Sequence, residues 1–103
     1  YRSSYASYIK PVTYAVIKHG MVGLTKYFSS LYGPKNIRVN MVSPGPVKNN
    51  QNLKLLEEIE NMTPMGRLGN PKDILGLLFF LAGDESSYIT GQNILVDGGK
   101  TII

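Results

Sequence analysis

The residues best suited to chemistry are a tyrosine and a lysine four positions apart, Tyr14 and Lys18. In an α-helix this spacing places both side chains on one face, one turn apart. An ammonium near a phenol stabilises the phenolate, which lowers a tyrosine pKa from its ordinary value of about 10. Such a tyrosine exchanges a proton with a carbonyl or alcohol oxygen near neutral pH. The spacing alone favours a different interpretation, a packed tyrosine beside a solvated lysine, because the chain has seven tyrosines.

The other reactive side chains form weaker patterns. His19 is the only histidine, and it points about 100° away from Lys18 around a helix. No second metal ligand is spaced to join it. Three glutamates within residues 57–60 are typical of a solvated helix face. The absence of cysteine excludes disulfides, thiolate ligands and a thiol nucleophile. The sequence therefore predicts no metal site.

Composition limits the class of protein. A chain of 103 residues, 43% hydrophobic and 17% charged, fits one small folded domain. The net charge of +4 comes from scattered lysines, so it indicates a solvated surface rather than a nucleic-acid interface. No apolar run approaches the roughly 18 residues that span a bilayer, and no signal peptide opens the chain. We therefore expect a cytoplasmic protein that has neither a membrane nor a nucleic acid as partner.

Hydrophobic periodicity and turn residues predict five elements. Apolar residues spaced four, three, four and three apart from Ile17 to Leu31 indicate a long helix. Gly20 and Gly23 within it predict close packing against a neighbouring element. The expected elements are a helix over 12–32, a strand over 36–43, a short helix over 53–62, a helix over 71–82 and a strand over 93–97.

The helix over 71–82 is apolar nearly all round, which predicts burial on more than one side. Asn70 is expected to cap its amino end. Asp73 lies in the first turn, where the helix dipole favours a negative charge. Asp97 is expected to stabilise the closing Gly98–Gly99 turn without a part in catalysis. Two strands joined through helices predict a parallel α/β unit.

Four segments together resemble one protein family. Tyr14 to Lys18, YAVIK, followed by Gly20, Leu24 and Thr25, resembles the active-site helix of short-chain dehydrogenases/reductases. The other three segments are NIRVNMVSPG over 36–45, PMGRLGNPKDI over 64–74 and SSYITGQNILVDGG over 86–99. They occur in the family's order and at its spacing, and they extend the resemblance over residues 14–99. The branches that the chain suggests are the bacterial sugar- or flagellin-modifying members and the 3-oxoacyl reductases.

The resemblance implies a fold, a cofactor and site residues. The fold would be the C-terminal portion of a Rossmann-type doubly wound parallel sheet, in the order helix-strand-helix-helix-strand. The cofactor would be NAD or NADP. Tyr14 would donate a proton to the substrate carbonyl, and Lys18 would bind the nicotinamide ribose. Pro44, Gly45 and Val47 would line the nicotinamide, with the backbone of Val47 reaching its carboxamide. Asn49 stands where many members have a cofactor-binding threonine, and an amide can still form that hydrogen bond.

The chain departs from the family pattern at its amino end. The Gly-rich phosphate turn and the residue that selects NAD or NADP are absent. We therefore expect residues 1–103 to form a single partial domain, with residues 1–11 as a loop or insertion. The family's catalytic serine would fall at Tyr1, so we expect the serine upstream, although Ser3, Ser4 and Ser7 are nearby.

Two functional hypotheses follow. In the first, the chain is the catalytic and substrate half of an NAD(P)-dependent oxidoreductase that acts on a small carbonyl or alcohol and is inactive alone. The alternative is a non-catalytic oligomerising fragment that cannot bind a dinucleotide by itself. Both hypotheses predict a homo-oligomer, a dimer or tetramer, formed through the helix with Gly20 and Gly23 or through sheet edges. Residues 46–62 match the family in position only and carry no information about the substrate.

Overall fold

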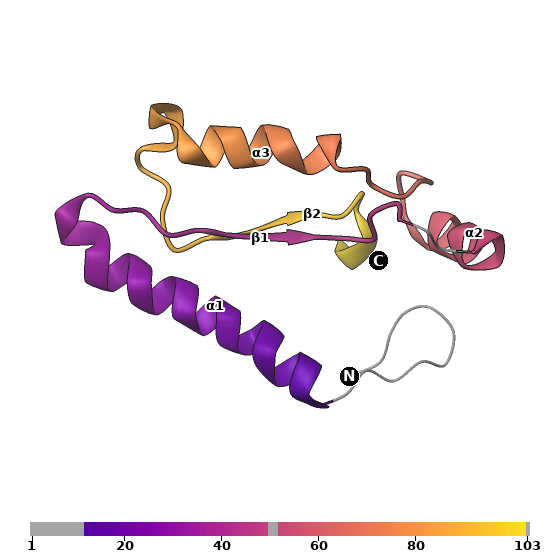
Figure 1. Ribbon diagram of the computed structural model, residues 1–103, viewed down its shortest axis with the longest axis horizontal. Helices are drawn as coiled ribbons and strands as arrows, with labels where there is room; N and C mark the ends of the chain where they lie inside the picture. The colour runs from indigo at the N-terminus through magenta and orange to yellow at the C-terminus, as the bar shows by residue number, and fades with distance from the viewer. Residues whose placement is uncertain (1–11, 50–51, 103) are drawn as a thin grey trace.

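A computed structural model describes residues 12–49 and 52–102 as helices on both sides of a small parallel sheet (Figure 1). The main elements follow the predicted order: α1 (Val12–Tyr32), β1 (Met41–Pro44), α2 (Leu53–Met62), α3 (Lys72–Ala82) and β2 (Asn93–Val96). Short 3-10 turns span Gly33–Lys35, Asp84–Ser86 and Lys100–Ile102. Within this described part of the chain, no helix is long and apolar enough to cross a membrane. The predicted segment 1–11 lies outside the described residues.

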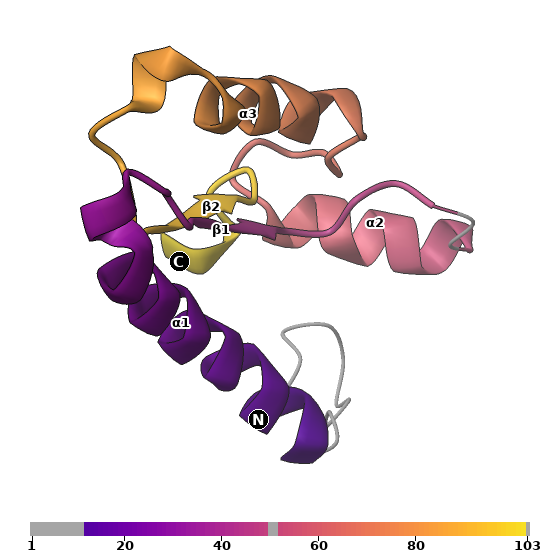
Figure 2. The same cartoon turned by 60° about the vertical axis from the view of Figure 1, so that its left-hand side comes forward.

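The two strands pair in parallel, as the sequence predicts. The register places Met41 opposite Asn93 and Pro44 opposite Val96. The backbone N–H of Met41 donates to the Gln92 carbonyl at 2.7 Å, at the start of the ladder. In both views, α1 lies on one side of this sheet and α3 on the other, and α2 lies beyond the carboxyl end of β1 (Figures 1 and 2). The arrangement is the helix-sheet-helix layering of an α/β fold.

β1 is shorter than the strand predicted over residues 36–43. The backbone N–H of Val39 donates to the Thr90 hydroxyl at 3.1 Å, and the side-chain oxygen of Asn40 accepts from the Gln92 N–H at 3.1 Å. Side chains thus replace some of the backbone partners in this stretch, although the Val39 carbonyl still accepts from the Gly91 N–H at 2.7 Å, and the regular ladder begins only at Met41. The predicted amino end of the strand is therefore wrong, because periodicity does not reveal which backbone groups side chains will take.

An arginine joins the segment before β1 to the end of α3. The guanidinium of Arg38 donates to the Ser86 hydroxyl at 2.9 Å and to the Gly83 carbonyl at 3.0 Å. Ser86 is fully buried, and its hydroxyl lies 2.8 Å from the Phe80 carbonyl. At the carboxyl end of α3, where helix geometry leaves carbonyls without intrahelical partners, Arg38 therefore binds the Gly83 carbonyl and Ser86 binds that of Phe80.

α1 faces the sheet with polar side chains. Thr25 and Ser29 are buried, and their hydroxyls bond to carbonyls of their own helix, Met21 at 2.8 Å and Lys26 at 2.9 Å. The apolar stripe from Ile17 to Leu31 lies about 100° further round the helix and is exposed. Its members and exposed fractions are Ile17 62%, Met21 45%, Leu24 54%, Phe28 37% and Leu31 50%.

Two packing predictions fail within the described residues. A Cβ at Gly20 or Gly23 would meet no atom within 4 Å, so the described chain supplies no close neighbour there. α3 has no buried residue, and Phe79 is 75% exposed, which contradicts burial on more than one side. Both failures have one physical reason: a two-stranded sheet is too narrow to cover helices of this length.

The exposed stripe of α1 predicts self-association, because a continuous row of exposed apolar side chains favours burial against a partner. Leu24→Gln should weaken association, and sedimentation equilibrium over a range of concentrations would measure the change. Lys26→Gln, at an exposed polar position on the same helix, is the matched control. A monomer at high concentration, or equal effects of the two substitutions, would contradict the prediction.

Candidate functional site

Tyr14 and Lys18 lie together on α1, as their spacing predicts. Both residues are half-buried, and the Lys18 ammonium is 5.7 Å from the centre of the Tyr14 ring. This distance is within the range of a cation–π contact. His19 has its Nδ1 at 2.8 Å from the Ala15 carbonyl oxygen of its own helix, and it lines the cavity described below together with Lys18. The structure therefore pairs Lys18 with the tyrosine, and His19 with the helix backbone.

The Lys18 side of α1 faces β1 across a cavity of about 170 Å³. Val22 shares the helical side of this cavity, and Met41 and Ser43 line the strand side. The Ser43 hydroxyl donates to the Asn93 side-chain oxygen at 2.6 Å, which links the first strand to the second. A small molecule beside Lys18 would thus contact both the helix and the edge of the sheet.

The Pro44–Gly45 turn lies at the carboxyl end of β1. The Gly45 N–H donates to the Val96 carbonyl at 2.8 Å, which extends the pairing of β1 with β2. A Cβ at Gly45 would lie 2.7 Å from both Cα and Cβ of Asp97. Only glycine fits here without a shift of backbone, so the turn and the end of β2 are in direct contact.

Asp97 organises the turn that Gly45 contacts. Its carboxylate accepts from the Gly99 N–H at 3.0 Å, and from the N–H and hydroxyl of Thr101 at 3.1 and 2.6 Å. The hydrogen bond from the Thr101 hydroxyl, with help from those backbone N–H groups, lowers the pKa of Asp97. Gly98 and Gly99 have φ of 63° and 88°, conformations that favour glycine. Asp97 therefore stabilises the closing turn, the structural role expected from the sequence.

A parallel bridge joins Val47 to Gly69. The Gly69 N–H donates to the Pro46 carbonyl at 2.9 Å, and the Lys48 N–H donates to the Gly69 carbonyl at 2.7 Å. Because the residues on either side of Val47 make these bonds, the N–H and C=O of Val47 itself point away from Gly69. The bridge thus sets the direction of the Val47 peptide groups.

The sequence-predicted cofactor residues form a continuous segment after β1. Pro44 and Gly45 are at the turn, and Val47 is in the bridge two residues later. Asn49 follows and is exposed, directly before the undescribed residues 50–51. Lys18, from a different element, shares its cavity with Met41 and Ser43, directly before this segment, whereas Tyr14 is not among the residues that line that cavity.

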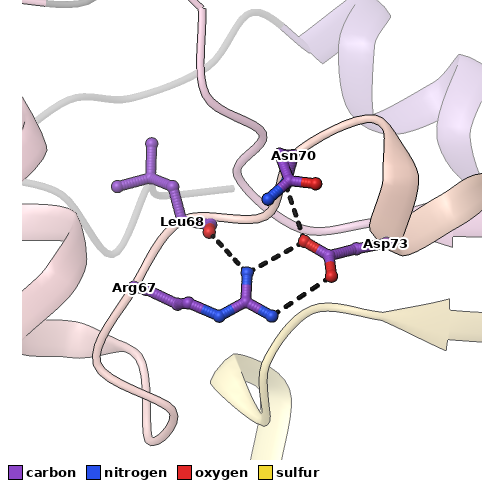
Figure 3. A network of polar contacts seen from close by, with 4 residues as sticks. All are labelled: Arg67, Leu68, Asn70 and Asp73. Atoms are coloured by element: carbon purple, nitrogen blue, oxygen red, sulfur yellow. Dashed lines mark hydrogen bonds and ion pairs between the residues drawn. The ribbon is translucent and has the colours of Figure 1, made fainter.

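Arg67 and Asp73 form an ion pair that the sequence analysis did not predict (Figure 3). The guanidinium donates to both carboxylate oxygens, at 2.9 and 3.1 Å, and to the Leu68 carbonyl at 3.1 Å. The same carboxylate accepts from the Asn70 N–H at 2.8 Å. The expectation that Asn70 caps α3 is wrong, because its side chain forms no cap hydrogen bond at the start of that helix. An acidic residue in the first turn, six positions after an arginine, was the available signal.

The Arg67–Asp73 contact changes the protonation of both groups. Hydrogen bonds from Arg67 and from the Asn70 N–H lower the pKa of Asp73 to about 2. The hydrogen bond to the Asp73 carboxylate raises the pKa of Arg67 above its ordinary value. Both side chains are charged at neutral pH, so the bidentate contact is intact under ordinary conditions.

Among the described residues, no group of three histidine, cysteine, aspartate or glutamate side chains is placed to hold a metal ion.

The amino-acid sequence matches a family model described as enoyl-(acyl carrier protein) reductase over residues 2–101. A 3-oxoacyl-(acyl-carrier-protein) reductase of Thermotoga maritima is 42% identical over 93 residues, which cover 86% of this chain and 38% of that protein. A 7alpha-hydroxysteroid dehydrogenase of Bacteroides fragilis is 42% identical over 94 residues, covering 86% of this chain and 36% of that protein.

Solved structures share the fold. A short-chain dehydrogenase of Leptospira borgpetersenii with bound NAD+ has a TM-score of 0.86 and 45% identity, covering 91% of this chain and 37% of that one. A 4-hydroxyisoleucine dehydrogenase complexed with NADH has a TM-score of 0.85 and 32% identity, covering 99% and 45%. The chain thus spans less than half the length of the relatives described here.

Gly45→Ala should lower the free energy of unfolding by about 1–3 kcal/mol, the usual cost of forcing atoms into a packed site. The reason is the 2.7 Å approach to Asp97. Urea denaturation would measure the loss. Gly76→Ala in α3, where a Cβ would meet no atom within 4 Å, is the control and should stabilise by up to about 1 kcal/mol. Equal stability of the Gly45→Ala variant and the unaltered protein would contradict the proposed contact.

The lowered pKa of Asp73 predicts a specific pH dependence of stability. Its folded-state pKa of about 2 lies below the ordinary value of 3.8. The ion pair is partly exposed, so its contribution to stability is small; that contribution is complete above pH 3.8 and is lost as the pH falls toward 2. Asp73→Asn removes the titrating group, so its unfolding free energy should decline less steeply between those pH values. Urea denaturation at a series of pH values would measure this. If the unfolding free energies of the variant and the unaltered protein decline in parallel, the ion pair does not contribute to stability.

Proposed function

The chain belongs to the short-chain dehydrogenase/reductase family, and from that membership we propose that its protein is an NAD(P)-dependent oxidoreductase that interconverts a carbonyl and an alcohol. The observation that carries the proposal is the pairing of Tyr14 with Lys18 on the side of α1 that faces β1. The carboxyl end of β1 leads into the Pro44–Gly45 turn, and ligands of open α/β sheets bind outside such strand ends.

In the reducing direction, Tyr14 donates its phenolic proton to the substrate oxygen while the substrate carbon gains a hydride. The Lys18 ammonium stabilises the negative charge that develops on the Tyr14 oxygen. In the oxidising direction, Tyr14 takes the proton back from the alcohol. A bound nicotinamide dinucleotide supplies or accepts the hydride. The positioning of Tyr14 by a regular helix supports this role, because a proton donor needs a fixed direction.

The described residues fit the nicotinamide end of such a cofactor. The N–H and C=O of Val47 point away from the Gly69 bridge, a direction suited to a carboxamide, which both donates and accepts hydrogen bonds. Pro44 and Gly45 would line the ring, and Lys18 would bind the ribose hydroxyls. Asn49 would contribute an amide hydrogen bond. NAD and NADP both fit this proposal.

The substrate is proposed to be a small carbonyl or alcohol. α2 and the segments that lead to it follow the nicotinamide-lining turn, so this part of the chain would contact the substrate. The amino end of α2 is capped by the Asn52 side chain, which accepts from the Leu55 N–H at 2.8 Å. Ser3, Ser4 and Ser7, the serines nearest to the position of the family's catalytic serine, lie outside the described residues.

The alternative function, an oligomerising chain without dinucleotide binding, is favoured by the exposed apolar stripe of α1. Both proposals include a homo-oligomer. Titration of the chain with NADH separates them, since saturable binding at micromolar concentrations contradicts the alternative.

In the full-length protein, Tyr14→Phe removes the proton donor and keeps the ring, so it should lower kcat by at least about a hundredfold, the usual scale of general acid catalysis. The dissociation constant for NADH should stay within about twofold, because the hydroxyl contacts the substrate rather than the nicotinamide ring. Steady-state kinetics and fluorescence titration would measure the two effects.

Tyr27→Phe makes the same change at an exposed position of α1 and serves as the control. Its turnover should equal that of the unaltered protein. Unchanged turnover in Tyr14→Phe would remove Tyr14 from the mechanism.

A further inference from the structure

The segment proposed to face the nicotinamide is oriented by one residue of a distant loop. Gly69 bonds to the Pro46 carbonyl at 2.9 Å and to the Lys48 N–H at 2.7 Å. The Val47 peptide groups turn away from Gly69 for that reason. A displacement of Gly69 would therefore rotate the groups that would bind the carboxamide.

The position of Gly69 depends on a closed ring of polar contacts (Figure 3). Before Gly69, Arg67 is bound to the Leu68 carbonyl at 3.1 Å. After it, the Asn70 N–H donates to Asp73 at 2.8 Å. The Arg67 guanidinium then joins the two sides through its bidentate contact with Asp73, at 2.9 and 3.1 Å. The backbone on both sides of Gly69 is thus tied to one ion pair.

We propose that the Arg67–Asp73 ion pair is a positioning pair, which holds Gly69 so that the peptide groups of Val47 are directed at the nicotinamide carboxamide. This inference rests on the proposed function and adds to it two residues that would not touch the cofactor. Arg67 acts through Gly69 and Val47, in that order.

Exposure distinguishes positioning from simple stabilisation. The side chains of Arg67 and Asp73 are 49% and 30% exposed. Exposed ion pairs contribute little to the free energy of folding, because water screens them and ordering two side chains costs entropy. The fixed geometry of a bidentate arginine contact is more significant, since the two parallel hydrogen bonds define a plane. Loss of this pair should therefore alter cofactor binding more than thermal stability.

The effect should be restricted to the nicotinamide end of the cofactor. ADP-ribose has the adenine, the phosphates and both riboses of NAD but lacks the carboxamide that Val47 would bind. Arg67→Met in the full-length protein should raise the dissociation constant for NADH, or for NADPH if that is the tighter ligand, by about tenfold. The dissociation constant for the matching ADP-ribose, or its 2′-phosphate, should change less than about twofold.

Conservative and matched variants complete the experiment. Arg67→Lys keeps the charge but loses the bidentate geometry, so its effect on NADH binding should be intermediate. Lys72→Met removes the same charge next to Asp73 without breaking the pair, and should leave binding unchanged. Arg38→Met removes an arginine that bonds to Ser86 and Gly83, far from Val47. It should lower the unfolding temperature more than Arg67→Met, yet leave both ligands bound normally.

Isothermal titration with the two ligands, with thermal unfolding of each variant, gives distinct results. The positioning role is supported if Arg67→Met weakens the binding of NADH or NADPH but not that of the ADP-ribose. Three results overturn it. Arg67→Met weakens binding of the dinucleotide and of the ADP-ribose equally, Arg67→Met leaves the binding of both unchanged, or Arg38→Met weakens dinucleotide binding as much as Arg67→Met does. Failure of the unaltered protein to bind either NADH or NADPH would instead overturn the proposed function, and the positioning role with it.

Discussion

The close approach of Gly45 to Asp97 is the contact on which the candidate site depends. It fixes the end of β1 against the turn after β2, where a Cβ would lie 2.7 Å from Asp97. A second contact of the same kind joins that turn to the loop before α3, because a Cβ at Gly98 would lie 2.7 Å from the Thr63 side chain. Three turns far apart in the sequence therefore meet beyond the carboxyl end of the sheet. Small residues at their contacts let the backbones come together.

α1 uses one face for packing and for the proposed chemistry. Tyr14, Lys18, Thr25 and Ser29 all fall within about 60° around the helix. The buried hydroxyls satisfy their own helix, so polar residues can face the sheet without a desolvation penalty. Ser29 also lies against Gly91, where a Cβ would be 2.7 Å from its Oγ. The packing that holds this face on the sheet thus also directs Lys18 toward β1.

Local signals predicted the elements well and their partners poorly. The helices over 12–32 and 53–62 and the strand at 93 follow from periodicity, which depends only on neighbouring residues. The predicted start of β1 was wrong because the Thr90 and Asn40 side chains accept hydrogen bonds from the backbone N–H groups of Val39 and Gln92 there. The predicted cap of α3 was wrong because the Asn70 side chain forms no hydrogen bond with the first turn of α3, and the Asp73 carboxylate binds the Asn70 N–H instead. The burial of α1 and α3 was misjudged because periodicity identifies an apolar face without showing what covers it.

The sequence by itself determined the order of the elements, the parallel α/β class and the family, because four motif segments in order carry that information. It also predicted the shared face of Tyr14 and Lys18, since a four-residue spacing acts within one helix. Only the tertiary structure decided which face of α1 meets the sheet, and that Gly69 orients Val47 under the control of Arg67 and Asp73. The packing of α1 on the sheet and the bridge between Val47 and Gly69 depend on contacts between segments about twenty or more residues apart, and no local pattern specifies such contacts.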